Sequence, residues 1–316
     1  MKTSIIIPTH DRANNLDCVL TSLSNQKTDR EWEIIVVDDR SKDNTEEIVK
    51  KYPSVKYYKV VSEHNSWNAS IPRNLGAKMA GGEILWFLDS DVVLPPGAVE
   101  ITISQFLKGR RERVLIGSYH WLSAQVVTSN DVTERFNDIV DGKLPSLKIF
   151  KKGMIGMNDI RQLSFDKAEN SQAEFYSFTD GLACFGGYLI LTKQTFWAAG
   201  GYDESMLAGV EDGDFGITLF EMGVRFSYLK GVCGYHIAHE QPSGRDNTII
   251  SAQVNRLNQK HNVDMIHQSG KAYRQWGIDW LPPTEFYNGD PQKLEEYKKL
   301  WQKEPMEFML KINKNA

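Results

Sequence analysis

Residues 83–93 read Glu-Ile-Leu-Trp-Phe-Leu-Asp-Ser-Asp-Val-Val, an apolar segment that ends in two carboxylates separated by one serine. The apolar run predicts a buried strand. Because successive side chains of a strand point to opposite faces, Asp89 and Asp91 can share a face, with Cα atoms roughly 6.5 Å apart. Such a pair can hold one hard divalent cation and its waters, which indicates a site for metal-held phosphate. The alternative is a strand that only ends in a turn, because Asp is common in turns and Pro95-Pro96 follow.

A second strand also ends in acidic residues. The apolar run Ile34-Ile35-Val36-Val37 closes with Asp38-Asp39. Short apolar runs alternate with helical periodicity through the first half of the chain, which is typical of βαβ units and a mostly parallel sheet. Ligands of such sheets bind beyond the carboxyl ends of the strands, so we expect Asp39, Asp89 and Asp91 at one site.

The expected elements of this half follow from apolar spacing and from helix-ending residues. Besides the run at 83–93, strands are expected at residues 5–8, 33–38, 56–61 and 114–118, and helices at 16–23, up to 52, at 72–80 and at 96–108.

The second half is less regular. Residues 120–180 are weakly periodic and yield no assignment. Three glycine-containing blocks then follow, and we expect a helix over 212–222, strands near Phe226 and Val232, and a helix over 249–261. The blocks cover residues 185–191, 200–204 and 209–214.

Composition excludes some classes of protein. The 316 residues include 37 basic and 41 acidic side chains, a net charge of -4 that provides no electrostatic footprint for nucleic acid. Three widely spaced cysteines, Cys18, Cys184 and Cys233, favour a reducing compartment over a disulfide framework, so a cytoplasmic location is expected. No secretory signal and no apolar run of membrane-spanning length occur in the sequence, which leaves peripheral membrane attachment open.

Six stretches, taken in order, resemble glycosyltransferases of the GT-A fold, most of all the inverting family 2. The family usually has Tyr-Asn where this chain has His10-Asp11, and Gly where it has Arg40. The stretches are Ile-Pro-Thr-His-Asp-Arg (7–12), Val-Asp-Asp-Arg-Ser (37–41), Pro-Arg-Asn-Leu-Gly (72–76), Asp-Ser-Asp (89–91), Gly-Gly-Tyr-Asp-Glu (200–204) and Glu-Asp (211–212).

The resemblance implies an α/β GT-A fold with a mostly parallel central sheet between helices. It implies a catalytic domain over residues 1–245, with a nucleotide-sugar-binding half at 1–110 and an acceptor-binding half at 111–245, followed by a C-terminal helical extension at 246–316. It also implies a nucleotide-sugar donor, a UDP-sugar, and an acceptor that is a glycan, a lipid-linked molecule or a protein.

A metal ion is expected to compensate the charge that develops on the diphosphate leaving group. By resemblance, Asp91 binds Mn²⁺ or Mg²⁺ and Asp89 binds the ribose, a metal-bound water or the metal. The third protein ligand is expected to be His239, with His236 as the alternative. An imidazole ligand favours Mn²⁺ over Mg²⁺.

Other residues are expected to bind the nucleotide. The Asp39 carboxylate can accept from an N–H of the base, and Pro8 and Thr9 are expected to wall that pocket. Arg73, near a helix start, and Arg12 are expected to meet phosphate oxygens. In addition, Gly187 is expected to allow close approach of the backbone to the donor sugar or acceptor.

Inversion requires a general base that removes the proton of the acceptor hydroxyl. The resemblance assigns this role to Asp212, with Glu211 as its acceptor-binding neighbour or substitute. Acidic residues also favour helix N-termini on electrostatic grounds alone. We expect Trp86 to be buried, and Trp121 to be the better candidate for stacking on an acceptor sugar.

Two alternatives remain open at this stage. A retaining GT-A transferase is one, because residues 200–206 also resemble polypeptide N-acetylgalactosaminyltransferases. A non-catalytic module that binds nucleotide sugars or glycans is the other. A dinucleotide-dependent dehydrogenase is excluded, because the turn after the first strand lacks Gly-x-Gly-x-x-Gly.

Overall fold

The large sheet has seven strands in the order β3-β2-β1-β4-β8-β6-β9. The structure is a computed structural model that describes residues 1–61, 68–122, 127–141, 143–144, 159, 161–169, 174–206, 210–237 and 247–263, and residues 292, 295 and 299. Only β8 runs antiparallel to its neighbours, which confirms the predicted mostly parallel sheet. The strands are β1 (Thr3–Thr9), β2 (Trp32–Asp38), β3 (Val55–Lys59), β4 (Ile84–Leu88), β6 (Val114–Ile116), β8 (Tyr188–Thr192) and β9 (Phe226–Tyr228).

A second sheet of three short strands lies beside the end of β4. Its order is β5-β10-β7, with β5 at Val92–Val93, β10 at Gly234–His236 and β7 at Tyr119–Trp121. The register pairs His236 with Val92 and with Trp121. This small sheet therefore carries residues from three distant parts of the chain to the end of β4.

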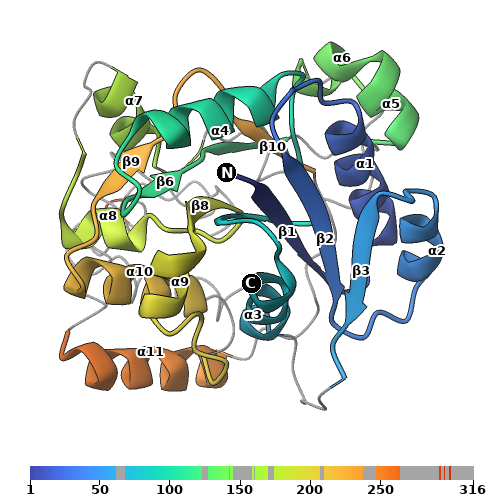
Figure 1. The fold of residues 1–316 in the computed structure, drawn as a ribbon. Coiled ribbons are helices and arrows are strands. Elements are labelled where there is room, and N and C mark those ends of the chain that lie inside the picture. The colour runs from blue at the N-terminus through green and yellow to red at the C-terminus, as the bar shows by residue number, and fades with distance from the viewer. Residues whose placement is uncertain are drawn as a thin grey trace.

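Helices cover both faces of the large sheet (Figure 1). Both faces of the sheet are apolar. The side chains of the continuous apolar strand β1 alternate between the faces, so Ile5 and Ile7 lie in one core and Ile6 lies in the other. The first face is covered by α1 (Ala13–Ser24), α2 (Thr45–Lys50), α4 (Ala98–Lys108), α5 (Ser129–Glu134) and α6 (Phe136–Val140); the second by α3 (Ser70–Met79), α7 (Gln162–Glu169), α8 (Phe178–Leu182), α9 (Lys193–Ala198), α10 (Glu211–Glu221) and α11 (Asn247–His261).

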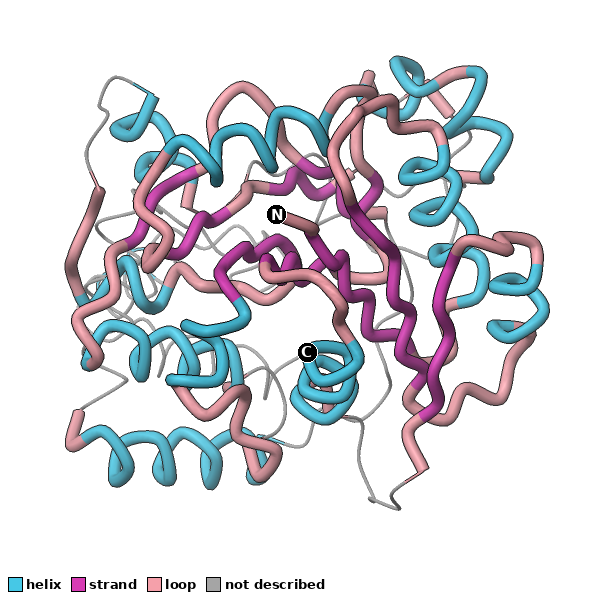
Figure 2. Tube along the Cα trace, in the orientation of Figure 1, coloured by secondary structure: helices cyan, strands magenta, loops and turns pink. Residues whose placement is uncertain are grey.

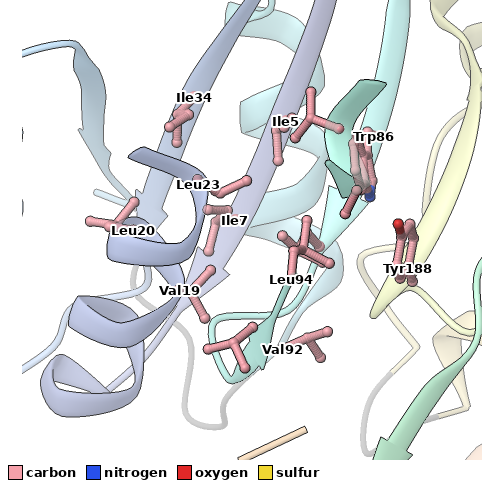
Figure 3. Close-up of a cluster of buried hydrophobic side chains, with 14 of the residues drawn as sticks. Ile5, Ile7, Val19, Leu20, Leu23, Ile34, Trp86, Val92, Leu94 and Tyr188 are labelled. Carbon is pink, nitrogen blue, oxygen red and sulfur yellow. The ribbon is translucent and has the colours of Figure 1, made fainter. Parts of the chain in front are cut away.

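Figure 3 shows the core between α1 and the sheet. Val19 and Leu20 of α1 are fully buried there, and each such side chain contributes about 1.5–3 kcal/mol to folding. Trp86 of β4 is also fully buried, as predicted, and stacks on Tyr188 of β8 with ring centroids 5.1 Å apart. This packing fixes the strand that leads into Asp89 and Asp91.

The predicted elements differ from the observed ones mainly in the second half. The strand expected near Val232 is β10, which begins two residues later at Gly234. In the stretch 120–180, which yielded no assignment, the described residues include the short helices α5, α6 and α7 and the start of α8 (Figure 2). The helix expected at 249–261 is α11. Its Leu257 is buried in the second core, while the proposed boundary at residue 245 stays a prediction.

Across the described ranges, no helix combines the length and the apolar character that crossing a membrane requires. Cys18, Cys184 and Cys233 are free thiols.

Candidate active site

The carboxyl ends of β1, β2 and β4 meet at one edge of the large sheet. Thr9 at the end of β1 is in register with Asp38 at the end of β2, and the Asp39 N–H donates to Thr9 O over 2.8 Å. Pro8, Thr9 and Asp39 are all buried. The three residues predicted to form the nucleoside pocket therefore lie together, as parallel strands require.

The loops after β1 and β2 are joined by hydrogen bonds, and each contains a residue with a positive φ angle. Asp11 and Arg40 have positive φ angles of 49° and 60°, a region that favours Gly and Asn. These are two of the positions where the chain departs from the family pattern of Asn and Gly, so the backbone shape that the pattern implies is retained. Asp11 Oδ1 accepts from the Lys42 N–H at 2.6 Å, and Arg40 Nε donates to Asp39 Oδ1 at 3.1 Å. Arg12 occupies the N-cap position of α1 without a capping hydrogen bond from its side chain, and its predicted contact with phosphate stays a prediction.

Arg73 occupies the centre of the site. Its side chain projects from the first turn of α3 and is 3% exposed. Nη1 donates to Asp212 Oδ1 at 2.9 Å and lies 3.5 Å from Glu211 Oε1, while Nη2 donates to Asp89 Oδ1 at 3.1 Å. The guanidinium also covers the ring of Tyr202, with Cζ 5.1 Å from the centroid. In this structure Arg73 thus binds carboxylates that follow β4 and that begin α10, and its predicted contact with phosphate stays a prediction.

Two glycines shape the space around these charges. A Cβ on Gly186 would lie 2.4 Å from Arg73 Cζ, and one on Gly187 would lie 2.6 Å from Asp89 Oδ2. The Asp89 N–H also donates to Gly187 O at 3.2 Å. The close approach expected at Gly187 is therefore made by the protein's own Asp89, and a contact with donor or acceptor stays a prediction.

Asp89 is held in an unusual electrostatic environment. Burial raises the pKa of Asp89, Arg73 opposes the rise, and the carboxylates Asp91 and Asp212 add to it, so that this pKa lies at about 6. Several carboxylates around one guanidinium leave a surplus of negative charge. Such a site favours a cation.

Asp91 faces His236 across the end of the small sheet. The Asp91 Oδ1 to His236 Nε2 distance is 3.3 Å, and the Ile237 N–H donates to Asp91 O at 2.8 Å, which fixes the two strands to each other. Trp121 covers the imidazole, with ring centroids 3.8 Å apart. Trp121 thus lies against a candidate metal ligand, and its predicted contact with an acceptor sugar stays a prediction.

The side chains of Asp91 and His236 are suitable ligands for Mn²⁺ or Mg²⁺, but they provide only part of a coordination shell. Asp91 and His236 supply one carboxylate and one imidazole, and a hard divalent ion at a nucleotide site commonly takes few protein ligands besides phosphate and water. Among the described residues, no group of three or more His, Cys, Asp or Glu side chains forms a metal site. His239 lies outside the described residues.

Glu211 and Asp212 form the start of α10. The side chain of Glu211 is 5% exposed and that of Asp212 is 19% exposed, so Asp212 is the one open to an acceptor. Both face Arg73. Acidic side chains in the first turn are favoured by the helix dipole, and the Arg73 hydrogen bond orients Asp212 in addition.

Sequence reasoning did not single out Asn74, which joins α3 to the Gly-Gly-Tyr-Asp-Glu stretch. Asn74 Nδ2 donates to Tyr202 O at 2.8 Å, and the Tyr202 N–H donates back to Asn74 Oδ1 at 2.9 Å. Gly200 and Gly201 both have positive φ angles, of 84° and 74°. The sequence did contain a signal for this contact. Adjacent residues of a helix point in different directions, so Asn74 could be expected to contact a different segment from Arg73.

Sequence reasoning gave no role to Asp214, although it assigned roles to the nearby carboxylates Glu211 and Asp212. Residues at i and i+2 of a helix do not face each other, so Asp214 points away from Asp212. Asp214 is 2% exposed and binds Lys260 and His261 of α11. Helical spacing alone could have separated this carboxylate from the site.

The arrangement therefore combines four chemical elements. A buried carboxylate lies at Asp39, a candidate cation site lies at Asp91 and His236, and a partly exposed carboxylate lies at Asp212. Arg73 connects the last two through Asp89. This α/β fold with its acidic site at the strand ends defines a protein of the GT-A glycosyltransferase class.

Comparisons with known proteins support that class. Glycosyl transferase family 2 matches residues 4–166, about half of the chain. The Poly(ribitol-phosphate) beta-N-acetylglucosaminyltransferase TarP of Staphylococcus aureus (strain N315) is 34% identical over 182 residues, which are 54% of this chain and 55% of TarP. A chondroitin synthase of Escherichia coli is 30% identical over 254 residues, 77% of this chain and 35% of that protein.

Solved structures show the same fold. The structure of S. aureus TarS 1-349 in complex with UDP-GlcNAc has a TM-score of 0.58 at 17% identity, and the match covers 94% of this chain and 78% of that one. The chain spans about half or less of the length of these two curated relatives. It belongs to glycosyl transferase family 2, which confirms the predicted family and the predicted glycosyltransferase class.

Proposed function

We propose that the protein transfers a sugar from a UDP-sugar to an acceptor hydroxyl with inversion, with Asp212 as general base. The observation that carries the proposal is the placement of Asp212, which is partly exposed and is held by Arg73 in the same cluster as Asp89. A base and a leaving-group site must face one another across the donor sugar for inversion. The link through Arg73 supports that placement.

The donor assignment is supported by two findings. Asp39, Pro8 and Thr9 are buried together at the carboxyl edge of the sheet, where nucleotides bind in such folds. In addition, the S. aureus TarS structures were solved with UDP and with UDP-GlcNAc. The names of the two curated relatives differ in product, so we propose only a UDP-sugar as the class of donor and a glycan hydroxyl as the class of acceptor.

Metal dependence is part of the proposal. Asp91 and His236 would hold Mn²⁺, and Asp89 would bind the ribose or a metal-bound water, with His239 as the remaining predicted ligand. The ion, when bound, would neutralise the charge that develops on the UDP leaving group. In the proposed reaction Asp212 removes the proton of the acceptor hydroxyl. Arg73 holds Asp212 and Asp89 in position through its two hydrogen bonds. A cytoplasmic location and peripheral membrane association stay predictions.

The test is release of UDP from UDP-GlcNAc and UDP-glucose, with Mn²⁺ and with EDTA. We expect release with Mn²⁺ from at least one donor, and loss of release in Asp212→Asn. NMR of the product then determines the anomeric configuration. A product that retains the configuration of the donor would overturn the role of Asp212 and favour the retaining alternative, and UDP binding without turnover would favour a binding module.

A further inference from the structure

The last turn of α11 lies against the first turn of α10, where the proposed base is located. Lys260 Nζ is 2.8 Å from Asp214 Oδ2, and His261 Nε2 is 2.9 Å from Asp214 Oδ1. Both oxygens of this buried carboxylate are thus bound by cations of one helix. Figure 1 shows α11 running below α10, so the contact joins two elements that are adjacent in space.

The same contact has further charged partners. His261 Nδ1 lies 2.9 Å from Glu221 Oε2 at the other end of α10, and Lys260 Nζ lies 3.1 Å from Asp203 Oδ2. Ionised carboxylates accept but cannot donate, so this arrangement favours the charged imidazole, which can donate from both nitrogens. Burial lowers the pKa of His261, but the hydrogen bonds with Asp214 and Glu221 outweigh burial and raise that pKa above its ordinary value.

An apolar contact accompanies the charges. Leu257, one turn before Lys260, is 1% exposed, and its Cδ1 is the nearest atom to the Cβ position of Gly213 at 3.8 Å. Gly213 is the residue between Asp212 and Asp214. Helix α11 therefore packs against the turn that carries the proposed base.

We propose that Lys260 and His261 are positioning residues that act through Asp214 to hold Asp212 in place for transfer. The inference rests on the proposed role of Asp212. The Asp214 N–H donates to Val210 O at 3.0 Å, so Asp214 belongs to the same hydrogen-bonded turn as Glu211 and Asp212. A shift of Asp214 changes the position of that turn, and a misplacement of about 1 Å can cost about 100-fold in rate.

The test compares the double variant Lys260→Met/His261→Gln with Arg256→Gln in the full chain. Arg256 is an exposed cation of the same helix and serves as the matched control. UDP affinity and stoichiometry are measured by calorimetry, and kcat is measured as UDP release from the better donor with Mn²⁺. We expect kcat of the double variant to fall about tenfold or more, with UDP binding unchanged and Arg256→Gln equal to wild type.

Two further variants separate positioning from folding. Lys260→Arg keeps the charge and is expected to retain kcat, and the milder His261→Gln is used if the double variant does not fold. Equal kcat in the double variant and wild type would overturn the inference, as would a loss of UDP binding in proportion to kcat. If wild type released no UDP from either donor, the proposed function itself would be overturned and the inference with it.

Discussion

Arg73 Nη1 donates to Asp212 Oδ1 at 2.9 Å across 139 positions of sequence. Nη2 of the same guanidinium donates to Asp89 at 3.1 Å. One buried side chain therefore links the end of β4 to the start of α10. We regard this link as the main structural determinant of the site.

Replacement of Arg73 by Lys is expected to damage both stability and transfer. Lysine presents one compact charge and cannot donate in two directions at once, so Asp89 or Asp212 loses its partner. Breaking a buried ion pair commonly costs 3–5 kcal/mol, so we expect a loss of about that size in the free energy of unfolding, measured with urea. Arg30→Lys is the control, because its pairing with Glu100 is exposed to solvent and is expected to contribute little to stability. Equal losses in the two variants would contradict this interpretation.

Asp212→Asn is expected to abolish transfer but leave the donor bound. Asparagine can still accept from Arg73 through its carbonyl oxygen, but it cannot take a proton, and general base catalysis contributes about 10²–10⁴-fold. The kcat of UDP release and the UDP affinity from calorimetry test this expectation. Glu211→Gln is the matched control, because Glu211 is buried beside the same arginine and should lose less activity. A larger loss in Glu211→Gln would assign the base to Glu211.

Removal of the metal ligands is expected to weaken only the Mn²⁺-dependent part of UDP binding. Asp91→Asn and His236→Gln each remove one candidate ligand of a pair that is 3.3 Å apart. We expect each to lower UDP affinity with Mn²⁺ by at least about tenfold, or ~1.4 kcal/mol, and to leave affinity in EDTA unchanged. His120→Gln is the control, since His120 lies on the opposite face of β7 from Trp121, which covers His236. Identical binding in Mn²⁺ and EDTA for wild type would contradict the metal site.

The sequence predicted the strand ends but not the contacts between them. Asp39, Asp89 and Asp91 were located because apolar runs predict strands, and parallel strands bring their ends to one edge. The role of Arg73 as a link could not be predicted, because it depends on how α3 and α10 pack on the same face of the sheet. Local spacing carries no information about a contact across 139 positions.

The segment 120–180 gave no assignment for a related physical reason. Its fully buried Arg161 pairs with Asp159, donates to Ala183 O at 2.6 Å and to Gly117 O at 3.1 Å, and Asp159 accepts from the Tyr119 N–H. Charged residues are normally exposed, so a sequence pattern cannot distinguish this pair from surface side chains. Here an ion pair takes the place of the apolar periodicity on which the prediction depends.

The stability of the protein is expected to fall as the pH falls below the ordinary range of Glu33. Burial raises the pKa of Glu33, but hydrogen bonds with Lys2, Lys56 and Ser4 lower it to about 2 from the ordinary 4.5. The unfolded chain therefore binds a proton at a higher pH than the folded one, so the stabilisation is present above about 4.5 and is lost as the pH falls toward about 2. The loss is at most about 3 kcal/mol.

Urea unfolding of wild type and Glu33→Gln between pH 6 and pH 3 tests this expectation. We expect Glu33→Gln to be less stable at pH 6 and to show a shallower dependence on pH. Glu47→Gln is the control, since Glu47 is a largely exposed carboxylate of α2. Parallel pH dependences of wild type and Glu33→Gln would contradict the assigned role.

Alanine is expected to have opposite effects at two helical glycines. Gly76 lies in α3, where a Cβ would come within 2.3 Å of Ile6 Cγ2, a fully buried side chain of β1. Overpacking of a filled core costs about 1–3 kcal/mol, which outweighs the ~1 kcal/mol that alanine gains over glycine in a helix. At Gly213 of α10 a Cβ would lie 3.8 Å from the nearest atom, so alanine causes no overpacking there. The higher helix propensity of alanine should therefore stabilise the fold by up to ~1 kcal/mol in Gly213→Ala. Urea unfolding gives both free energies of unfolding. Stabilisation by Gly76→Ala would mean that α3 is able to move away from β1, in which case Arg73, on the same helix, would not be rigidly placed between Asp89 and Asp212.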